Sequence, residues 1–433
     1  MEIIKKVSLI SLLIFLFLLP FGLTEANIGF FVFILGVFVN KDLYKNLSLS
    51  LKTISKPVKY FIIFSVAYWL WCIVSLLWSE DFSRGVQLCG RYIMLMAFPV
   101  SFYLAKVSEI IKNTKILVWV FIAGIMFSSF VCLYLSYLDC WVEGSEGFVF
   151  KTDTYYRDLD FFESVSFGFN HFSYSLLSHF LHPSYYSLYF LFSIIFILNI
   201  INYLHQITHK IFLIFLIIYM FVFIYMLQSR GNFLALIGMF AVFLLYTFII
   251  KFRLSYLIIG FTILCIVSYK LIFDSRLSII LNLMEQTYHA DAKGPEPKQF
   301  DNVNDRIIIW RNALQVIKEN PILGVGIGDT DTELEKQYQK NNVSFEFGTH
   351  NQYIYAQLSA GVVGLLLLLT ILFVPIYYGI KNRYFPLIGF SVAVMINLLF
   401  ENMLTRNAGL MFFPWAMMAL LMMSEENKKV LEK

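Results

Sequence analysis

Two arginines on one amphipathic stretch, RIIIWRNALQVIKEN, differ in the chemistry that their positions allow. The apolar spacing predicts a helix from about Asn304 to Asn320, which Pro321 ends. At 100° per residue, Arg306 projects from the middle of the apolar face and Arg311 from the polar face. Arg306 shares its face with Trp310, Ala313 and Ile317, and Arg311 shares its face with Gln315 and Lys318.

A guanidinium on a buried face needs an anion beside it, because an unpaired charge is costly to remove from water. We therefore expect Arg306 to meet an anionic ligand. The alternative is an arginine that reaches out to solvent or pairs with a carboxylate near the helix start. Arg311 is predicted to be an ordinary solvated charge.

A second arginine site is predicted in the segment LQSRGNF at 227–233, which interrupts an apolar run. Ser229, Arg230 and Gly231 fall at the N-terminus of the helix that follows. Free backbone N–H groups, the positive end of the helix dipole and a guanidinium together favour phosphate. A tight turn anchored by Arg230 is the alternative interpretation.

The segment THN at 349–351 repeats this geometry at the start of another apolar helix, with His350 followed by Asn351. A helix N-terminus disfavours an imidazolium, so we expect a neutral His350 that can accept a proton as a general base. A structural histidine is the alternative. His182 and Tyr185 in HPSYYSLYF, together with Trp310 and Asn351, are further candidates for substrate binding.

The spacing of the other external histidines does not predict a metal site. His171, His179 and His182 lack a compact ligand motif such as HExxH, and we expect neither a metal nor a cofactor. GVGIGD follows no predicted strand, so its glycines are expected to shape a turn and not to bind a dinucleotide. DTD at 329–331 is interpreted as a solvated turn.

The composition identifies the elements that must position these residues. The 433 residues are 59% hydrophobic and 14% charged, with a mean hydropathy of +0.71, which predicts an all-α polytopic membrane protein. The N-terminal apolar run lacks a small-x-small cleavage site and is expected to stay as the first helix. The five cysteines are expected to be isolated thiols. About twelve spans are predicted, near 7–23, 26–40, 59–78, 88–105, 114–137, 181–203, 211–228, 231–250, 253–273, 351–379, 384–400 and 407–424.

Lysine and arginine are concentrated in alternate connectors, which predicts that both termini are cytoplasmic. The chain then divides into residues 1–273, with spans 1–9 and a smaller periplasmic loop at 138–180; a large, partly helical periplasmic loop at 274–350 between spans 9 and 10; and residues 351–433, with spans 10–12 and a cytoplasmic tail. All the candidate site residues fall on the periplasmic face.

The sequence resembles the bacterial O-antigen ligase and polysaccharide polymerase superfamily. The matching elements are SRG between mid-chain spans, RIIIW with NPILGVGIGD in the large external loop, and HNQYIYAQLSAGVVGLLL at the next span. Their order and sidedness also match. The resemblance covers the second half of the chain in motifs and the first half in hydropathy alone.

This resemblance implies glycan transfer at the periplasmic face of the inner membrane. The donor would be a glycan on undecaprenyl diphosphate, and the acceptor a sugar hydroxyl of lipid A–core. By motif, Arg230 and Arg306 would hold the diphosphate and His350 would activate the acceptor. We expect direct, inverting, metal-independent displacement, with membrane lipids as surroundings and no nucleic-acid partner.

Three other functions stay open at this stage. A polymerase of O-antigen or exopolysaccharide would use the same donor with a lipid-linked glycan as acceptor. A protein O-oligosaccharyltransferase is a third enzyme of this kind. A lipid-linked sugar flippase would also have about twelve spans, but it predicts charged or broken helices near the middle of the membrane.

Overall fold

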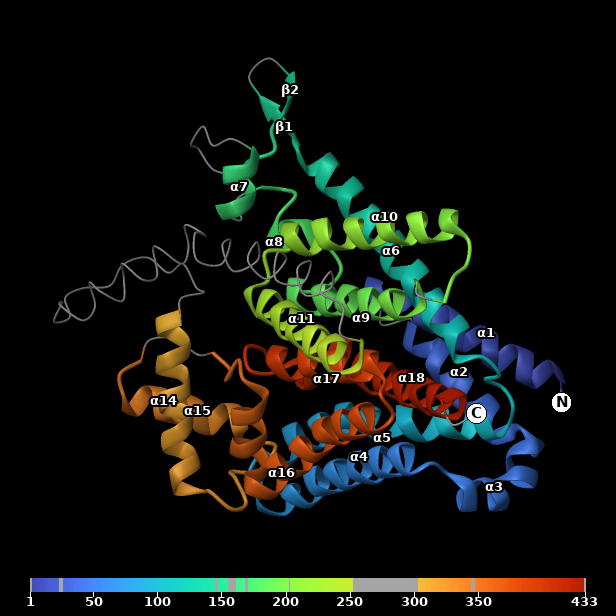
Figure 1. The fold of residues 1–433 in the computed structure, drawn as a ribbon. Helices are drawn as coiled ribbons and strands as arrows, with labels where there is room; N and C mark the ends of the chain where they lie inside the picture. Colours follow the sequence, from blue (N-terminus) through green and yellow to red (C-terminus); the bar gives the residue numbers. More distant parts are fainter. Residues whose placement is uncertain are drawn as a thin grey trace.

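The computed structural model describes residues 2–22, 26–144, 147–154, 161–167, 170–201, 203–251, 303–343 and 347–431. These residues are mostly helical (Figure 1). The predicted span 253–273 and the predicted domain boundary after residue 273 lie outside them. The boundary between residues 350 and 351 falls at the N-cap residue of a helix, Asn351.

In the described part of the chain, eight helices are long and apolar enough to cross a membrane. They are α1 with η1 (Glu2–Phe21), α4 with η2 (Lys56–Trp78), α5 (Phe82–Val107), α6 (Thr114–Asp139), α9 (Pro183–Ile201), α10 (Ile207–Met226), α16 (Gln352–Lys381) and α18 (Asn407–Leu431). The chain is therefore a polytopic helical membrane protein.

Three further apolar helices coincide with predicted spans but are not among these eight. Helix α2 (Ala26–Val39) bends by 61° into α3 (Lys41–Thr53), and the pair makes a ninth span if it counts as one. Helices α11 (Arg230–Lys251) and α17 (Phe385–Asn397) are the other two. The predicted count of twelve stays a prediction.

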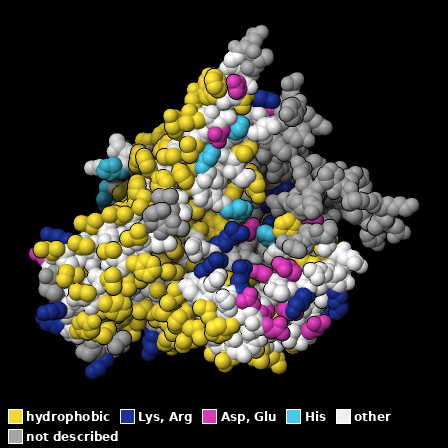
Figure 2. Space-filling model, turned by 180° about the vertical axis from the view of Figure 1, so that it is seen from behind, with side chains coloured by type: hydrophobic (Ala, Val, Ile, Leu, Met, Phe, Trp, Pro, Cys, Tyr) yellow, Lys and Arg dark blue, Asp and Glu magenta, His cyan; other side chains and the backbone are white. Residues whose placement is uncertain are grey.

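The centre of the bundle is made by α9, α17 and α18, whose side chains are buried almost throughout. Aromatic rings fill it: Phe412 lies 4.1 Å from Tyr189 and 5.5 Å from Phe192, centroid to centroid. The outer helices instead expose apolar side chains, such as Phe212 and Phe215 on α10. Figure 2 shows a broad hydrophobic surface of this kind, which suits contact with lipid.

Both chain termini lie at one end of the bundle, and α14 (Val303–Glu319) and α15 (Thr330–Lys340) lie at the other (Figure 1). At the end with the termini, Lys5 pairs with Asp42 at 2.7 Å and Lys106 with Glu426 at 3.7 Å. These contacts gather the lysine-rich connectors together. The two termini lie at the same end, as an even number of spans requires. The assignment of this end to the cytoplasm stays a prediction from lysine content.

The segment 138–180 adds one small antiparallel hairpin to a fold that is otherwise helical in the described residues, as predicted. Strands β1 (Trp141–Gly144) and β2 (Gly147–Phe150) pair with Trp141 opposite Phe150, and the short helices α7 (Phe161–Phe167) and α8 (Tyr174–Leu177) follow. Tryptophan, valine and phenylalanine favour strands. The acidic residues nearby led the sequence reasoning to treat the segment only as a polar loop.

Helix α16 is broken at Gly361, where an uninterrupted span had been predicted. Gly361 has φ 65° and ψ −167°, a conformation that side-chain-bearing residues rarely adopt. Backbone carbonyls freed by the break accept hydrogen bonds from other segments: Leu358 from Val325 N at 2.9 Å, Ser359 from Gly326 N at 3.2 Å, and Ala360 from Trp71 Nε1 at 2.8 Å.

The segment GVGIGD forms the turn that seals this break, as its glycines predicted. Gly324 and Gly326 have φ values of 73° and 97°. A Cβ on Gly324 would lie 2.6 Å from the Leu358 carbonyl oxygen, so only glycine allows this close approach. The turn thus connects the external helices to the membrane-spanning bundle.

The interpretation of DTD as a solvated turn is wrong. Asp329 is buried, and its two carboxylate oxygens accept hydrogen bonds from the backbone N–H groups of Glu80 and Asp81, each at 2.7 Å. Asp331 pairs with Arg84 at 2.9 Å. Amides near the start of α5 need acceptors, and the carboxylate supplies them from a distant part of the chain. Sequence spacing alone could not reveal such a pairing.

We predict that Gly361→Ala destabilises the protein by at least about 2 kcal/mol, because alanine is strained at this φ and its methyl group would collide with the Ile322 carbonyl. Thermal unfolding in detergent measures the loss. Gly90→Ala on α5 is the matched control, since a Cβ there meets nothing within 4 Å. Equal melting temperatures for the two variants would contradict the broken-helix geometry.

Candidate active site

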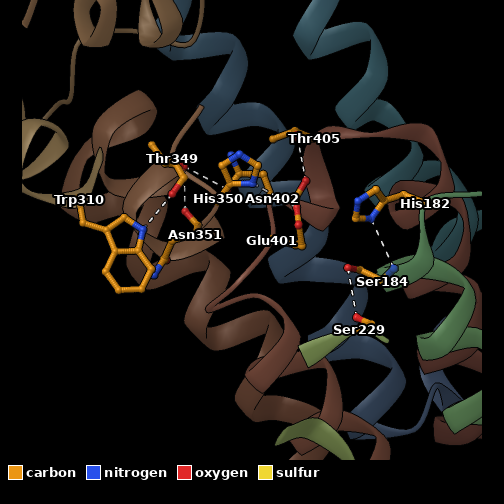
Figure 3. A network of polar contacts seen from close by, with 10 residues as sticks. All are labelled: His182, Ser184, Ser229, Trp310, Thr349, His350, Asn351, Glu401, Asn402 and Thr405. Carbon is orange, nitrogen blue, oxygen red and sulfur yellow. Dashed lines mark hydrogen bonds and ion pairs between the residues drawn. The ribbon is translucent and has the colours of Figure 1, made fainter. Parts of the chain in front are cut away.

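The candidate site lies at the end of the bundle opposite the termini, where five segments meet. They are the starts of α9, α11 and α16, the external helix α14, and the connector between α17 and α18, here called the 398–406 connector. Figure 3 shows the polar groups that these segments bring together.

The start of α16 is fixed by its cap and by the 398–406 connector. The Asn351 side-chain oxygen accepts hydrogen bonds from the N–H groups of Tyr353 and Ile354, at 3.0 and 3.1 Å. Gln352 N donates to Leu398 O at 2.8 Å, and Gln352 Oε1 accepts from Leu404 N at 2.9 Å. Asn351 is thus buried and used as a cap.

His350 precedes this cap with a left-handed backbone, at φ 45°. Its neighbour Thr349 donates a hydrogen bond from Oγ1 to Asn402 Oδ1 at 3.0 Å. The carbonyl of Thr349 accepts a hydrogen bond from Trp310 Nε1 on α14 at 2.9 Å. The backbone of the candidate base is therefore held from both the external helix and the 398–406 connector, as Figure 3 shows.

Glu401 is a site residue that the sequence reasoning missed. Its Oε2 lies 3.5 Å from Nδ1 of His350, and its side chain is 19% exposed, against 38% for the histidine. A single glutamate some fifty residues beyond the histidine carries no motif, so only the fold could place the two together. The carboxylate therefore lies deeper in the protein, and the imidazole ring lies nearer to the surface.

Burial alone would raise the pKa of the Glu401 carboxyl, because it disfavours the charged form. The hydrogen bond with His350 and the positive charges around it outweigh this effect and hold that pKa below its ordinary value. Arg306 contributes as a permanent charge, whereas His350 and His182 contribute only in their protonated forms. Glu401 therefore acts as a charged carboxylate at neutral pH.

The structure confirms the predicted faces of α14. Ala313 is fully buried and Arg306 and Trp310 are half-buried, whereas Arg311 is exposed. The guanidinium carbon of Arg306 lies 6.0 Å from the centre of the Phe400 ring. Arg306 thus borders the 398–406 connector next to Glu401.

The start of α11 borders the same connector. A Cβ on Gly231 would lie 3.3 Å from the Phe400 side chain, so this helix start packs directly against it. Phe400 is therefore the shared neighbour of the Arg230–Gly231 segment and of Arg306. Two arginine-bearing elements, far apart in sequence, meet at one aromatic ring.

Ser229 ties α11 to the start of α9. Its hydroxyl is buried and lies 3.4 Å from Ser184 Oγ, and Asn232 Nδ2 donates both to Ser229 Oγ at 2.8 Å and to Ser184 O at 2.9 Å. Backbone N–H groups of Asn232 and Phe233 donate to Ser229 O. The serine therefore caps and anchors this helix start beneath the half-buried Arg230.

His182 and Tyr185 occupy two different environments at the start of α9. His182 is exposed, and its Nδ1 accepts a hydrogen bond from Ser184 N at 3.4 Å. Its imidazole is near enough to Glu401 to act on that carboxylate when protonated, so it lies within the candidate site. Tyr185 is only 4% exposed and lies against Gly409 of α18, so it lines the interior beneath the site.

His171 and His179 lie elsewhere, in the part of the segment 138–180 that follows the hairpin. His179 Nε2 is 3.2 Å from Ser136 Oγ and 3.8 Å from Asp139, and His171 also lies near Asp139 and Asp153. Within the described ranges, no three histidine, cysteine, aspartate or glutamate side chains are grouped as a metal ion would require.

These groups define a class of protein: a membrane protein whose helix ends bring arginines and a histidine–carboxylate pair together at one end of the bundle. Residues 215–369 match the family described as O-antigen ligase, which confirms the resemblance to that superfamily over this stretch. The match runs from α10 into α16 and includes Arg230, Arg306 and His350. It supports a function within the O-antigen ligase and polymerase superfamily.

One relative extends the comparison without adding a function. An uncharacterized protein of Haemophilus influenzae is 40% identical to this chain over 81 residues. The match covers 18% of this chain and only 20% of that protein's length.

We predict that Trp310→Phe loosens α14, although an aromatic ring stays at this position. The change removes the donor to the Thr349 carbonyl, a hydrogen bond that contributes about 1 kcal/mol. Amide hydrogen exchange in α14 and around His350 should then become roughly fivefold faster, provided that local opening breaks this bond. Trp119→Phe on α6, which contacts Phe196 within the bundle, is the control. Unchanged exchange in Trp310→Phe would show that this bond does not couple the two segments.

Proposed function

We propose that this protein is a glycosyltransferase of the periplasmic face of the bacterial inner membrane. It moves a glycan from undecaprenyl diphosphate to a sugar hydroxyl, as in O-antigen ligation to lipid A–core during lipopolysaccharide synthesis. The observation that carries the proposal is the meeting of His350, Arg306 and the start of α11 around the 398–406 connector. A reaction in which a hydroxyl displaces a diphosphate needs cations beside the leaving group and a base beside the hydroxyl.

The positive groups suit the donor's leaving group. The phosphate oxygens would be bound by Arg306, by Arg230 and by the N–H groups at the start of α11. Each guanidinium can bind two phosphate oxygens at once. Their charge would stabilise the negative charge that grows on the diphosphate as it leaves. The broad apolar surface beside the site would accept the polyprenyl chain in the membrane.

His350 would take the acceptor's proton on its Nε2 atom. The hydroxyl oxygen then forms the new bond to the anomeric carbon, while the bond from that carbon to the diphosphate oxygen breaks. The diphosphate leaves with the bonding electrons as undecaprenyl diphosphate. This direct displacement inverts the anomeric centre, and the arginines supply the positive charge that a metal ion provides in other transferases.

A polymerase that extends a lipid-linked glycan is the second candidate. The hairpin at 141–150 and the helices α7 and α8 would then be a second structured element on the external face, in addition to α14 and α15. Such an element could hold a second lipid-linked glycan. The glycolipids of a deletion strain distinguish the two functions. Loss of capped lipopolysaccharide with polymeric lipid-linked glycan retained indicates a ligase, and retained single-repeat caps indicate a polymerase.

A flippase fits less well, and a protein O-oligosaccharyltransferase stays a third enzymatic alternative. The break in α16 is the kind of feature that a transporter uses, because freed carbonyls can bind a substrate. Here the carbonyls of Leu358, Ser359 and Ala360 are occupied by protein donors. The polar groups instead gather at one end of the bundle, as a transferase site requires.

We predict that Arg306→Ala lowers transfer by about 10²–10³-fold with normal protein levels, because a preorganised charge at the leaving group is lost. Arg306→Lys should also be poor, since an ammonium lacks the planar fork that grips two phosphate oxygens. Arg311→Ala is the control on the exposed face of the same helix and should be nearly normal. Lipopolysaccharide gels of complemented deletion strains measure this. An inactive Arg311→Ala beside an active Arg306→Ala would refute the assignment.

We predict that His350→Ala loses transfer by about 10²–10⁴-fold, the contribution of a positioned general base. Binding of the lipid-linked donor should survive, because arginines and helix N-termini hold the diphosphate. The measurement uses purified protein in nanodiscs, with and without EDTA. Little effect of the chelator is expected. Full loss with EDTA and recovery with a divalent cation would overturn the metal-independent mechanism.

A further inference from the structure

Glu401 lies between the candidate base and the cations of two other elements. Its Oε2 faces Nδ1 of His350, and His182 at the start of α9 and Arg306 on α14 are both near enough to act on it. Tyr185 on α9 is near both Glu401 and Arg406. The carboxylate is therefore surrounded by groups that favour its charged form.

The pair is held in place by the backbone on both sides. Glu401 N donates to Asn397 O at 3.0 Å, at the end of α17. Beside it, Asn402 accepts the hydrogen bond from Thr349, and Leu404 N donates to Gln352. The residues on either side of His350 are thus bonded to the residues that follow Glu401.

We propose that Glu401 is the positioning residue for His350. Its carboxylate accepts a hydrogen bond from the Nδ1–H group, which leaves Nε2 as the unprotonated nitrogen that faces the acceptor hydroxyl. This inference rests on the proposed transfer reaction. In the reaction, the hydroxyl proton moves to Nε2 and the imidazole becomes positively charged. The carboxylate stabilises that charge and takes no proton itself.

The exposure of the two side chains agrees with this order of contacts. The ring is the more exposed member, so one nitrogen can reach a substrate while the other contacts the deeper carboxylate. A histidine whose second nitrogen is fixed by an acceptor also has a fixed tautomer and ring orientation. Orientation and base strength would both come from Glu401.

The first test measures the charge state of His350 without any substrate. Diethyl pyrocarbonate modifies unprotonated imidazole, and the chymotryptic peptide from Gly348 to Tyr353 contains His350 as its single histidine. Labelling of the full-length protein in nanodiscs across pH gives the pH of half-reaction. Glu401→Gln should lower this midpoint by about one unit or more, because the imidazolium loses an opposite charge within 4 Å. Glu401→Asp should bring it back toward the wild-type value.

The second test is transfer kinetics with the same variants. Glu401→Gln should lower kcat by between about 10- and 10⁴-fold with little change in KM for the donor. The acid limb of its pH profile should move with the labelling midpoint, which a merely structural role would not cause. Glu319→Gln is the matched control, since this carboxylate is 62% exposed at the far end of α14. It should leave both readouts unchanged.

The outcomes separate this inference from the proposed function. Equal labelling midpoints in wild type and Glu401→Gln would overturn the inference, and so would a lowered midpoint with normal kcat. A wild-type protein without transfer activity would contradict the proposed function instead. In that case the labelling midpoints would still decide whether Glu401 controls the charge of His350.

Discussion

The hydrogen bonds between the start of α16 and the 398–406 connector determine where every group of the candidate site lies. Gln352 bonds to Leu398 and Leu404, and Thr349 bonds to Asn402. These contacts set the imidazole of His350 beside the carboxylate of Glu401. They also place Phe400 where the start of α11 and Arg306 both pack against it. Without this junction, the arginines of α11 and α14 and the base ahead of α16 would have no shared neighbour.

A second junction connects the external helices to the membrane-spanning bundle. The glycine turn after α14 occupies the break in α16, and Asp329 binds the backbone ahead of α5. Both contacts bury polar groups that must be satisfied away from water. Helix α14 is therefore fixed at two points, through this turn and through Trp310. A helix fixed in this way can present an arginine in a constant position, which catalysis by electrostatic stabilisation requires.

Local sequence patterns were sufficient for much of this arrangement. The 3.6-residue period distinguished Arg306 from Arg311, and the breaks in the apolar runs located the helix starts at Arg230 and His350. Glu401, Asp329 and the break at Gly361 were not predictable, because each depends on partners in distant segments. The hairpin at 141–150 was missed for a different reason. Its strands are short and exposed, so they lack the half-buried alternation that identifies a strand.

Product analysis with reconstituted protein tests the central claim most directly. The purified chain in nanodiscs would receive a glycan on undecaprenyl diphosphate and rough lipopolysaccharide, and mass spectrometry would follow both lipids. The account predicts that the intact glycan appears on the core sugar together with an equal amount of undecaprenyl diphosphate. NMR of the new linkage should show the opposite anomeric configuration to that of the donor. A product with retained configuration, or no consumption of the donor, would contradict it.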